Sequence, residues 1–289
     1  MLFRSAAKLA AYARAGVTRM SLGVQSLRPH VLASLGRTHD PRNVTHAIAC
    51  AREAGIDRVN VDLIYGTPGE TVDDWRRTLE GALTLAPEHV SAYALTVEPG
   101  TPLGRAVAEG RRPGPDDDDQ AEKYAIADDA LGAAGLEWYE ISNWARRGEE
   151  CRHNLLYWDQ GEYLGIGCAA HGHTRGRRWW NVRGPDRYLE LVAAGGTAEA
   201  GDERLDDAAR AEEAFTLALR TRRGAPLHAA AELTARTLAD EGLLVSGNSR
   251  VVLTRAGRLL ASDLTARLLL AGAAGPAPAA ALALGTLEC

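Results

Sequence analysis

The sequence predicts an α/β fold in which helices alternate with parallel strands, followed by a smaller α+β unit. Three observations support this prediction. Helical and strand patterns alternate over roughly the first hundred residues, the strands are apolar on one side only, and the last third shows the order helix, helix, hairpin, helix. Strands connected through helices pair in parallel, because a long crossover returns the chain to the same end of the sheet.

The elements of the alternating part have clear starts and stops. Strands are expected at 18–25, 58–65 and 89–96. Helices are expected up to Gly16, at 41–55 and from Thr71 onward. Thr71 is a suitable N-cap, and Asp73 and Asp74 place carboxylates in the first turn, where the helix dipole favours negative charge.

The first two strands differ between their two faces, since successive side chains of a strand point to opposite sides. One face is apolar and carries Met20, Leu22, Val24, Val59, Val61 and Leu63. The other carries Ser21, Gly23, Gln25, Asn60 and Asp62. A doubly wound sheet would be apolar on both faces, so the pattern favours an open or closed barrel with a polar interior. Functional groups of barrel enzymes gather at the C-terminal strand ends, here Gln25, Asp62 and Thr96.

The remainder of the chain changes in character twice. Residues 111–119 are typical of a linker running into a helix, and their aspartates are interpreted as a solvated first turn rather than a metal site. The helix should reach about residue 134, with a strand at 136–142. Later elements are expected at 206–221 (helix), 228–241 (helix) and 243–253 (hairpin). With a final helix, this order resembles a winged helix.

Composition and charge argue against several classes of protein. No apolar run approaches the roughly 20 residues that span a bilayer. The net charge of −5 argues against nucleic acid as the main partner. The cysteines show no close spacing of the zinc or redox type, so reduced thiols and a cytoplasmic setting are expected. The basic stretch 1–39 is similar to a mitochondrial transit peptide, but it joins the fold smoothly and is interpreted as structure.

Three stretches form an ordered set of motifs. They are Ser21-Leu-Gly-Val-Gln-Ser26 with Leu35-Gly-Arg-Thr-His39, Asn60-Val-Asp-Leu-Ile-Tyr-Gly-Thr-Pro-Gly69, and Arg152-His-Asn-Leu-Leu-Tyr-Trp158 with Tyr163-Leu-Gly-Ile-Gly167. Together they resemble the family of HemW-type heme chaperones and oxygen-independent coproporphyrinogen III oxidases, which are radical S-adenosylmethionine (radical SAM) proteins. The resemblance implies a partial (β/α) radical SAM barrel that lacks its first three βα units and is followed by a winged-helix-like α+β domain.

The resemblance also implies four regions. They are the C-terminal half of the barrel (1–110), an extension carrying the His-Asn-x-x-Tyr-Trp motif (111–200), the winged-helix-like domain (201–272) and a disordered tail (273–289).

Family members bind S-adenosylmethionine at the rim of the barrel, and the matching residues here are Gln25, Arg37 and Asp62. Arg37 would pair with the methionine carboxylate, and Gln25 and Asp62 would contact the ribose diol. Thr96 and His171 match positions that touch the cofactor mainly through backbone atoms. Singly, each side chain has an ordinary structural interpretation, such as a solvated arginine. The family spacing favours the cofactor role.

The stretch from His153 to Trp158 separates the two branches of the family. The chaperone branch carries His-Asn-x-x-Tyr-Trp, as this chain does, and the oxidase branch differs there. The resemblance implies heme contact at His153, Tyr157 and Trp158, because imidazole can ligate iron and aromatic faces can pack on a porphyrin. The alternative is that the two rings belong to a core and His153 caps a helix. Near His171 the sequence departs from the family pattern, with Ala169 in place of Gly and Gly172 in place of Ser.

The Cys-x-x-x-Cys-x-x-Cys loop that holds the family's 4Fe–4S cluster does not occur in this sequence. We expect a truncation or a misplaced start. We also expect that this polypeptide carries out no radical chemistry, so its status as an enzyme stays open. An exposed strand edge should make it poorly soluble.

Heme or porphyrin is the expected ligand, with heme-accepting proteins as partners. The first alternative is an oxygen-independent coproporphyrinogen III oxidase. The second is a winged-helix DNA-binding protein, which the acidic helix at 228–241 disfavours because Arg236 is its only candidate base reader.

Overall fold

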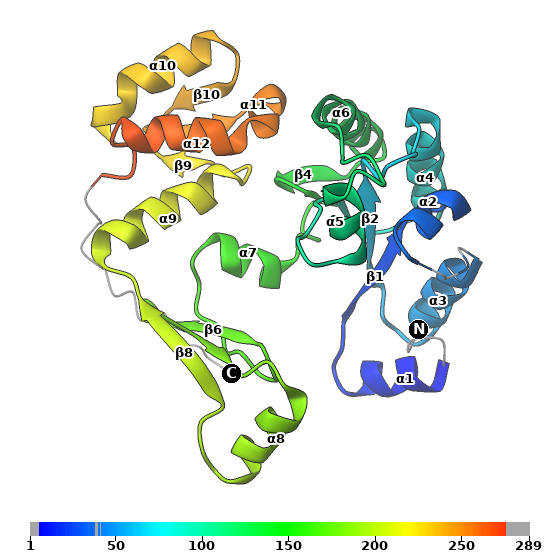
Figure 1. Ribbon diagram of the computed structural model, residues 1–289. Helices are drawn as coiled ribbons and strands as arrows, with labels where there is room; N and C mark the ends of the chain where they lie inside the picture. The colour runs from blue at the N-terminus through cyan, green and yellow to red at the C-terminus, as the bar shows by residue number, and fades with distance from the viewer. Residues whose placement is uncertain (1–5, 38–39, 41, 276–289) are drawn as a thin grey trace. The chain divides into compact units, whose positions relative to one another are not determined.

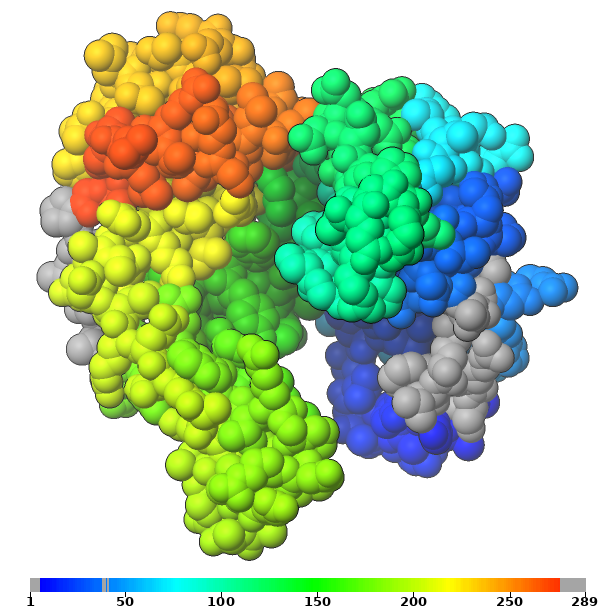
Figure 2. All heavy atoms as spheres, viewed as in Figure 1, coloured from blue at the N-terminus to red at the C-terminus, as the bar shows by residue number. Residues whose placement is uncertain are grey.

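The computed structural model describes residues 6–37, 40 and 42–275, and the remaining residues are grey in Figure 1 and Figure 2. Most of the predicted tail 273–289 therefore lies outside the described residues. The chain divides into two compact units, Met1–Glu150 and Cys151–Cys289. Within the described residues, no helix is both long and apolar enough to cross a bilayer.

The first unit is built on a five-stranded sheet. Its elements are α1 (Ala6–Arg14), β1 (Arg19–Gln25), α2 (Pro29–Ser34), α3 (Arg42–Glu53), β2 (Arg58–Tyr65), α4 (Val72–Thr84), β3 (His89–Ala94), α5 (Pro102–Ala108), α6 (Asp117–Ala133), β4 (Glu137–Glu140) and β5 (Asn143–Ala145). The strand order is β1-β2-β3-β5-β4, and β1, β2 and β3 run parallel. β1 and β2 lie side by side in Figure 1. The predicted α/β fold is confirmed.

Helices pack on one face of this sheet and leave the other polar. α3 contacts β1, and α6 contacts β2 and β3. The buried core comes from the strand positions predicted to be apolar, among them Met20, Val24, Val61 and Leu63. Along β1 the burial alternates, with Ser21 and Gly23 exposed between buried neighbours. This alternation positions polar side chains along a single face.

The end of the first unit differs from the sequence prediction. The strand expected at 136–142 ends at Glu140, and the chain then turns back into the short strand β5. β5 lies between β3 and β4 and pairs antiparallel with both. Its three residues, Asn143 to Ala145, are all buried, so they show no alternation that a sequence pattern could reveal.

The second unit holds two small antiparallel sheets. Its elements are α7 (Arg152–Trp158), β6 (His171–Thr174), β7 (Arg177–Asn181), α8 (Pro185–Ala193), β8 (Glu199–Arg204), α9 (Asp207–Leu219), β9 (Ala225–Pro226), the 3₁₀ helix η1 (Ala229–Ala231), α10 (Glu232–Asp240), β10 (Leu244–Gly247), β11 (Arg250–Leu253), α11 (Arg255–Leu259) and α12 (Ala261–Leu270). The sheet orders are β6-β7-β8 and β10-β11-β9. Residues 171–173 form part of β6.

The last third follows the predicted order of helix, helix, hairpin and helix. The elements from α9 to α12 appear in yellow to orange-red as one packed group of atoms in Figure 2. In α10, the Arg236 guanidinium is 3.1 Å from the Glu232 carboxylate, an ion pair within the helix. The candidate base reader is therefore paired with an acidic neighbour on its own helix.

Candidate functional site

The C-terminal end of β1 has an unusual backbone at Gln25. Its φ is 65°, a left-handed conformation that non-glycine residues rarely adopt, and the pairing of β1 with β2 shifts register between Gly23 and Gln25. A Cβ added to Gly23 would lie only 2.8 Å from the side-chain nitrogen of Gln25, Nε2. The Gln25 side chain therefore folds back over Gly23, and the missing side chain of the glycine leaves it room.

Asp62 lies beside this glycine on the polar face, because Gly23 and Asp62 are register partners of β1 and β2. Its Oδ2 accepts a hydrogen bond from Ser21 Oγ at 2.6 Å, and its Oδ1 accepts one from Asn60 Nδ2 at 2.7 Å. The carboxylate is half-buried. The structure thus brings Gln25 and Asp62, two of the predicted site residues, to neighbouring positions on one face.

Arg37 and Thr96 lie in loops of the same unit. Arg37 follows α2, where its backbone N–H donates to Leu32 O at 2.8 Å. Its side chain is exposed, and among the described residues no carboxylate pairs with it. Thr96 is exposed two residues beyond the end of β3. The motif residues Thr38 and His39 lie outside the described part of the chain.

A chain of buried polar side chains extends from Asp62 across the sheet, and sequence reasoning missed most of it. Asn60 Nδ2 also donates to Ser91 Oγ at 3.0 Å, and Asn60 Oδ1 is 2.6 Å from His89 Nδ1. His89 Nε2 is 2.7 Å from the Tyr139 hydroxyl. Burial lowers the pKa of His89 to about 3, and the charge of Arg19 adds to the effect, so its imidazole is neutral.

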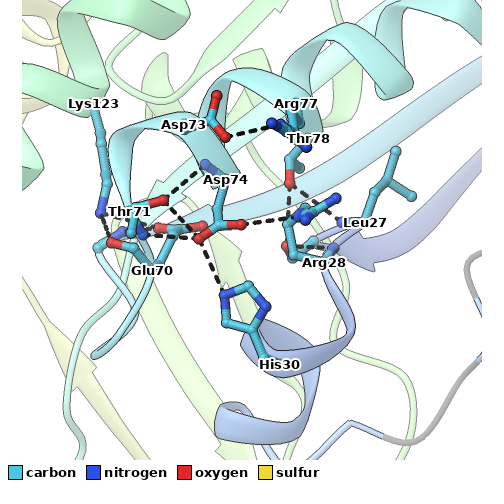
Figure 3. Close-up of polar contacts among 12 residues, drawn as sticks. Leu27, Arg28, His30, Glu70, Thr71, Asp73, Asp74, Arg77, Thr78 and Lys123 are labelled. Atoms are coloured by element: carbon cyan, nitrogen blue, oxygen red, sulfur yellow. Dashed lines mark hydrogen bonds and ion pairs between the residues drawn. The ribbon is translucent and has the colours of Figure 1, made fainter.

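The start of α4 is fixed by a second polar cluster, shown in Figure 3. Thr71 and Asp74 form a capping box, as the predicted N-cap suggested. Arg28 Nε and His30 Nε2 reach the Asp74 carboxylate at 2.9 and 3.1 Å. Burial alone would raise the pKa of Asp74, but hydrogen bonds from Thr71 and Arg28 and the nearby His30 hold it well below its usual range.

The loop between β2 and α4 is held by Lys123, a fully buried lysine of α6 that also appears in Figure 3. Its Nζ donates to the backbone oxygen of Glu70 at 2.8 Å and to Asp119 Oδ2 at 2.7 Å. Glu70 Oε2 accepts from Gly66 N at 2.8 Å. Burial raises the pKa of Glu70, and Lys123 opposes that shift. This cluster therefore anchors the turn that follows the β2 strand end.

In the second unit, α7 presents the His-Asn-x-x-Tyr-Trp motif, with His153 and Tyr157 one turn apart. Their rings meet edge to face at 4.9 Å between centroids, and the Tyr157 hydroxyl is 3.1 Å from His153 Nε2. Tyr157 in turn meets Tyr163 at 4.6 Å. Both His153 and Tyr157 are exposed, the latter by 39%. His153 and Tyr157 thus form an accessible aromatic surface, next to the half-buried Trp158.

The two remaining predicted residues lie in the same unit. The Trp158 indole N–H has no hydrogen-bond partner within the described residues. His171 is exposed at the start of β6, with its ring 6.0 Å from that of Trp180. His171 therefore belongs to a different unit from Gln25 and Asp62.

The resemblance implies three groups, namely S-adenosylmethionine, heme and a 4Fe–4S cluster, and the residues present suit the first two better than the third. Gln25 and Asp62 offer an amide and a carboxylate beside an open glycine, which suits a ribose diol. The exposed imidazole and aromatic rings of α7 suit a flat, iron-containing ligand. A 4Fe–4S cluster does not fit the residues present, because the chain has no Cys-x-x-x-Cys-x-x-Cys loop and the described cysteines Cys50, Cys151 and Cys168 are far apart in sequence.

Residues 2–82 match the model of the radical SAM superfamily. The chain is 47% identical to the heme chaperone HemW of Mycobacterium tuberculosis over 258 residues, which are 88% of this chain and 66% of that protein. It is 35% identical to heme chaperone HemW of Bacillus subtilis over 270 residues, 90% of this chain and 71% of the relative.

Among solved structures, coproporphyrinogen III oxidase (HemN) from Escherichia coli, a radical SAM enzyme, has a TM-score of 0.75 and covers 91% of this chain and 67% of its own. At 20% identity this likeness shows the fold. The chain spans just under two thirds of the length of the M. tuberculosis relatives. With the B. subtilis relative matched over more than two thirds of its length, the chain belongs to the HemW family of radical SAM proteins.

Proposed function

We propose that this protein binds heme for delivery to heme-accepting proteins in the cytoplasm, and that S-adenosylmethionine binds in its first unit. The observation that carries the heme proposal is the exposed aromatic surface of α7. It consists of His153 and Tyr157, whose rings are in contact, and it is extended by the half-buried Tyr163, whose ring meets that of Tyr157. A relative that is 47% identical over 258 aligned residues is named a heme chaperone.

On this surface, the residues would divide the recognition of heme between them. The His153 imidazole supplies a nitrogen ligand for iron, and its contact with the Tyr157 hydroxyl restrains the ring. The faces of Tyr157 and Tyr163 supply apolar area for the porphyrin. Trp158, which is half-buried, would add part of its indole ring to the porphyrin contact, while its N–H is buried and lacks a hydrogen-bond partner within the described residues.

In the first unit, Gln25 and Asp62 would hold the ribose of S-adenosylmethionine, and Arg37 its carboxylate. Thr96, in the same unit, would add backbone contacts. The cofactor supplies a sulfonium that can be cleaved reductively where a 4Fe–4S cluster is bound. This chain holds no ligand set for the cluster, so the proposed role of its residues is to bind and orient the nucleotide.

The oxidase alternative has less support. The likeness to coproporphyrinogen III oxidase is one of fold at 20% identity, whereas the relatives with higher identity are named heme chaperones. The His-Asn-x-x-Tyr-Trp motif, which the resemblance assigns to the chaperone branch, is present in full at 153–158. These observations favour heme binding over decarboxylation of a porphyrinogen.

A heme titration tests the proposal directly. The protein and its His153→Ala variant are titrated with heme, and binding is followed by the Soret band. We expect the variant to bind at least tenfold more weakly and with a shifted Soret maximum, because an iron ligand is lost. The control is His228→Asn, which removes an exposed imidazole but can keep its N-cap bond to Ala230 N. Equal affinity of parent and His153→Ala would contradict the proposal.

A further inference from the structure

The direction of each hydrogen bond in the buried chain of the first unit follows from the chemistry of its groups. Asp62 Oδ1 accepts a hydrogen bond from the amide nitrogen of Asn60 at 2.7 Å, since a carboxylate offers acceptors to its neighbours. The Asn60 oxygen then faces His89 Nδ1 at 2.6 Å. His89 Nδ1 must therefore carry the proton and donate.

The other end of the chain follows by the same reasoning. With its proton on Nδ1, the neutral His89 has a lone pair on Nε2. Among the residues that the structure describes, the Tyr139 hydroxyl, 2.7 Å away, is the group that donates to it. All bonds thus point one way, from Tyr139 through His89 and Asn60 to Asp62.

The chain is isolated from water along most of its length. His89, Tyr139 and Asn60 are 2%, 2% and 7% exposed. Reversing one member would leave a buried donor facing a donor, or an acceptor facing an acceptor, and such an unmade hydrogen bond costs about 1–3 kcal/mol. The Asn60 amide is therefore locked with its nitrogen toward Asp62.

We propose that His89 is a positioning residue for nucleoside recognition: through the amide of Asn60 it holds the Asp62 carboxylate in one orientation, ready to accept a hydrogen bond from the ribose of an adenosyl ligand. This inference rests on the proposed binding of S-adenosylmethionine. Ser21 completes the arrangement by donating to the second oxygen, Asp62 Oδ2, at 2.6 Å. Each Asp62 oxygen then has one internal donor and keeps lone pairs for the ligand.

Asp62 and His89 should affect ligand binding in different ways. Asp62 makes the contact, whereas His89 lies on β3 and acts only through Asn60. Loss of His89 should therefore reduce the contribution of the ribose hydroxyl to affinity, and leave contacts to the rest of the ligand unchanged. A general loss of stability would not produce this selective effect.

The test is a cycle of two ligands and several variants. S-adenosylhomocysteine and its 2′-deoxy analogue are titrated into the full chain by calorimetry. We expect the parent to prefer the ribose form by roughly tenfold or more, as a hydrogen bond to a charged group implies. In Asp62→Asn and in His89→Leu this preference should fall below about threefold. His89→Asn, whose side-chain amide can donate near the former Nδ1, should restore most of it.

Trp75→Phe serves as the matched control. It removes another buried hydrogen bond of the first unit, from Trp75 Nε1 to Lys123 O at 2.8 Å, outside the chain that leads to Asp62. This variant should be less stable than the parent and keep the full ribose preference. A ribose preference lowered equally by Trp75→Phe and His89→Leu would overturn the positioning role.

Different results would contradict the nucleotide site and the positioning role of His89. If the parent does not bind S-adenosylhomocysteine, or binds both ligands equally, the nucleotide site itself is wrong. If the parent discriminates and His89→Leu discriminates as well, the site stands and the positioning role of His89 is overturned. Should His89→Leu not fold, the nitrogen-15 shifts of His89 in the parent decide: the Nδ1–H tautomer supports the proposal, and the Nε2–H tautomer contradicts it.

Discussion

The two units hold their candidate site residues in opposite ways. In the first unit, Asn60 and His89 are buried and joined by hydrogen bonds that end at Asp62. In the second unit, His153 and Tyr157 are exposed on the seven-residue helix α7 and contact mainly each other and nearby rings. One site is built from directional bonds inside the protein, and the other from aromatic faces at its surface.

This difference matches the chemistry of the two proposed ligands. A ribose offers hydroxyl groups whose positions must be met within a few tenths of an ångström, which requires supporting side chains that cannot rotate. A porphyrin offers a large flat face, which aromatic rings bind without such exact alignment. Buried polar groups should therefore control stability in the first unit, whereas surface substitutions in the second should change binding with little effect on folding.

The largest expected effect comes from the buried charge of Lys123. Lys123→Met removes the cation that bonds Glu70 O and Asp119 and lies 3.4 Å from Glu70 Oε2. Breaking a buried ion pair from one side destabilises by about 3–5 kcal/mol, because a desolvated charge is left behind. Urea unfolding followed by circular dichroism measures the loss. Adding Glu70→Gln to the variant should recover part of it.

An exposed ion pair of the second unit provides the comparison. Arg187→Met breaks the contact between Arg187 and Glu190, which lie 3.1 Å apart on α8 with both side chains largely in water. Such pairs contribute between 0 and about 1 kcal/mol. Equal losses for Lys123→Met and Arg187→Met would show that burial does not separate the two units in the way argued above.

A smaller effect is expected from the titration of His89. Its folded pKa of about 3 lies below its ordinary value of 6.5. As pH falls below about 6.5 the unfolded chain takes up a proton first, so stability decreases by up to about 1.4 kcal/mol per pH unit until the folded imidazole also protonates. Above that range the contribution is constant.

Comparing His89→Asn with the parent isolates this contribution, because the carboxylates titrate in both proteins. The difference in unfolding free energy between them should change between pH 7 and pH 4, in the direction of a relative loss for the parent. If the difference in unfolding free energy stays constant between pH 7 and pH 4, His89 is not held neutral in the folded protein.

The sequence could predict the strands and one face of the first unit, because a period of two is visible in the chain itself. Met20, Leu22 and Val24 are buried and Ser21 and Gly23 are not, as the alternation required. The N-cap at Thr71 was predictable for a similar reason, since cap and partner are three residues apart. Both are local patterns.

The hydrogen-bond chain was beyond local reasoning. Asn60 and His89 are 29 residues apart, and their contact depends on the register that pairs them across β2 and β3. The strand β7 was hidden as well: it reads Arg-Arg-Trp-Trp-Asn, and four of its five residues are half-buried, so no alternation marks it. The helical form of 152–158 also escaped prediction, because the stretch shows no side-chain N-cap bond at Cys151.

The smallest expected effect tests the surface character of α7. Tyr157→Phe removes the hydroxyl that lies 3.1 Å from His153 Nε2 and keeps the ring that meets Tyr163. Because this hydrogen bond is exposed, the free energy of unfolding should change by no more than about 0.5 kcal/mol. Heme affinity should fall only a few-fold, since the porphyrin still packs on the ring and the imidazole loses only a restraint. A stability loss above about 1 kcal/mol would place this bond in the same class as the buried chain of the first unit, and the contrast between directional interior bonds and an adaptable aromatic surface would no longer hold.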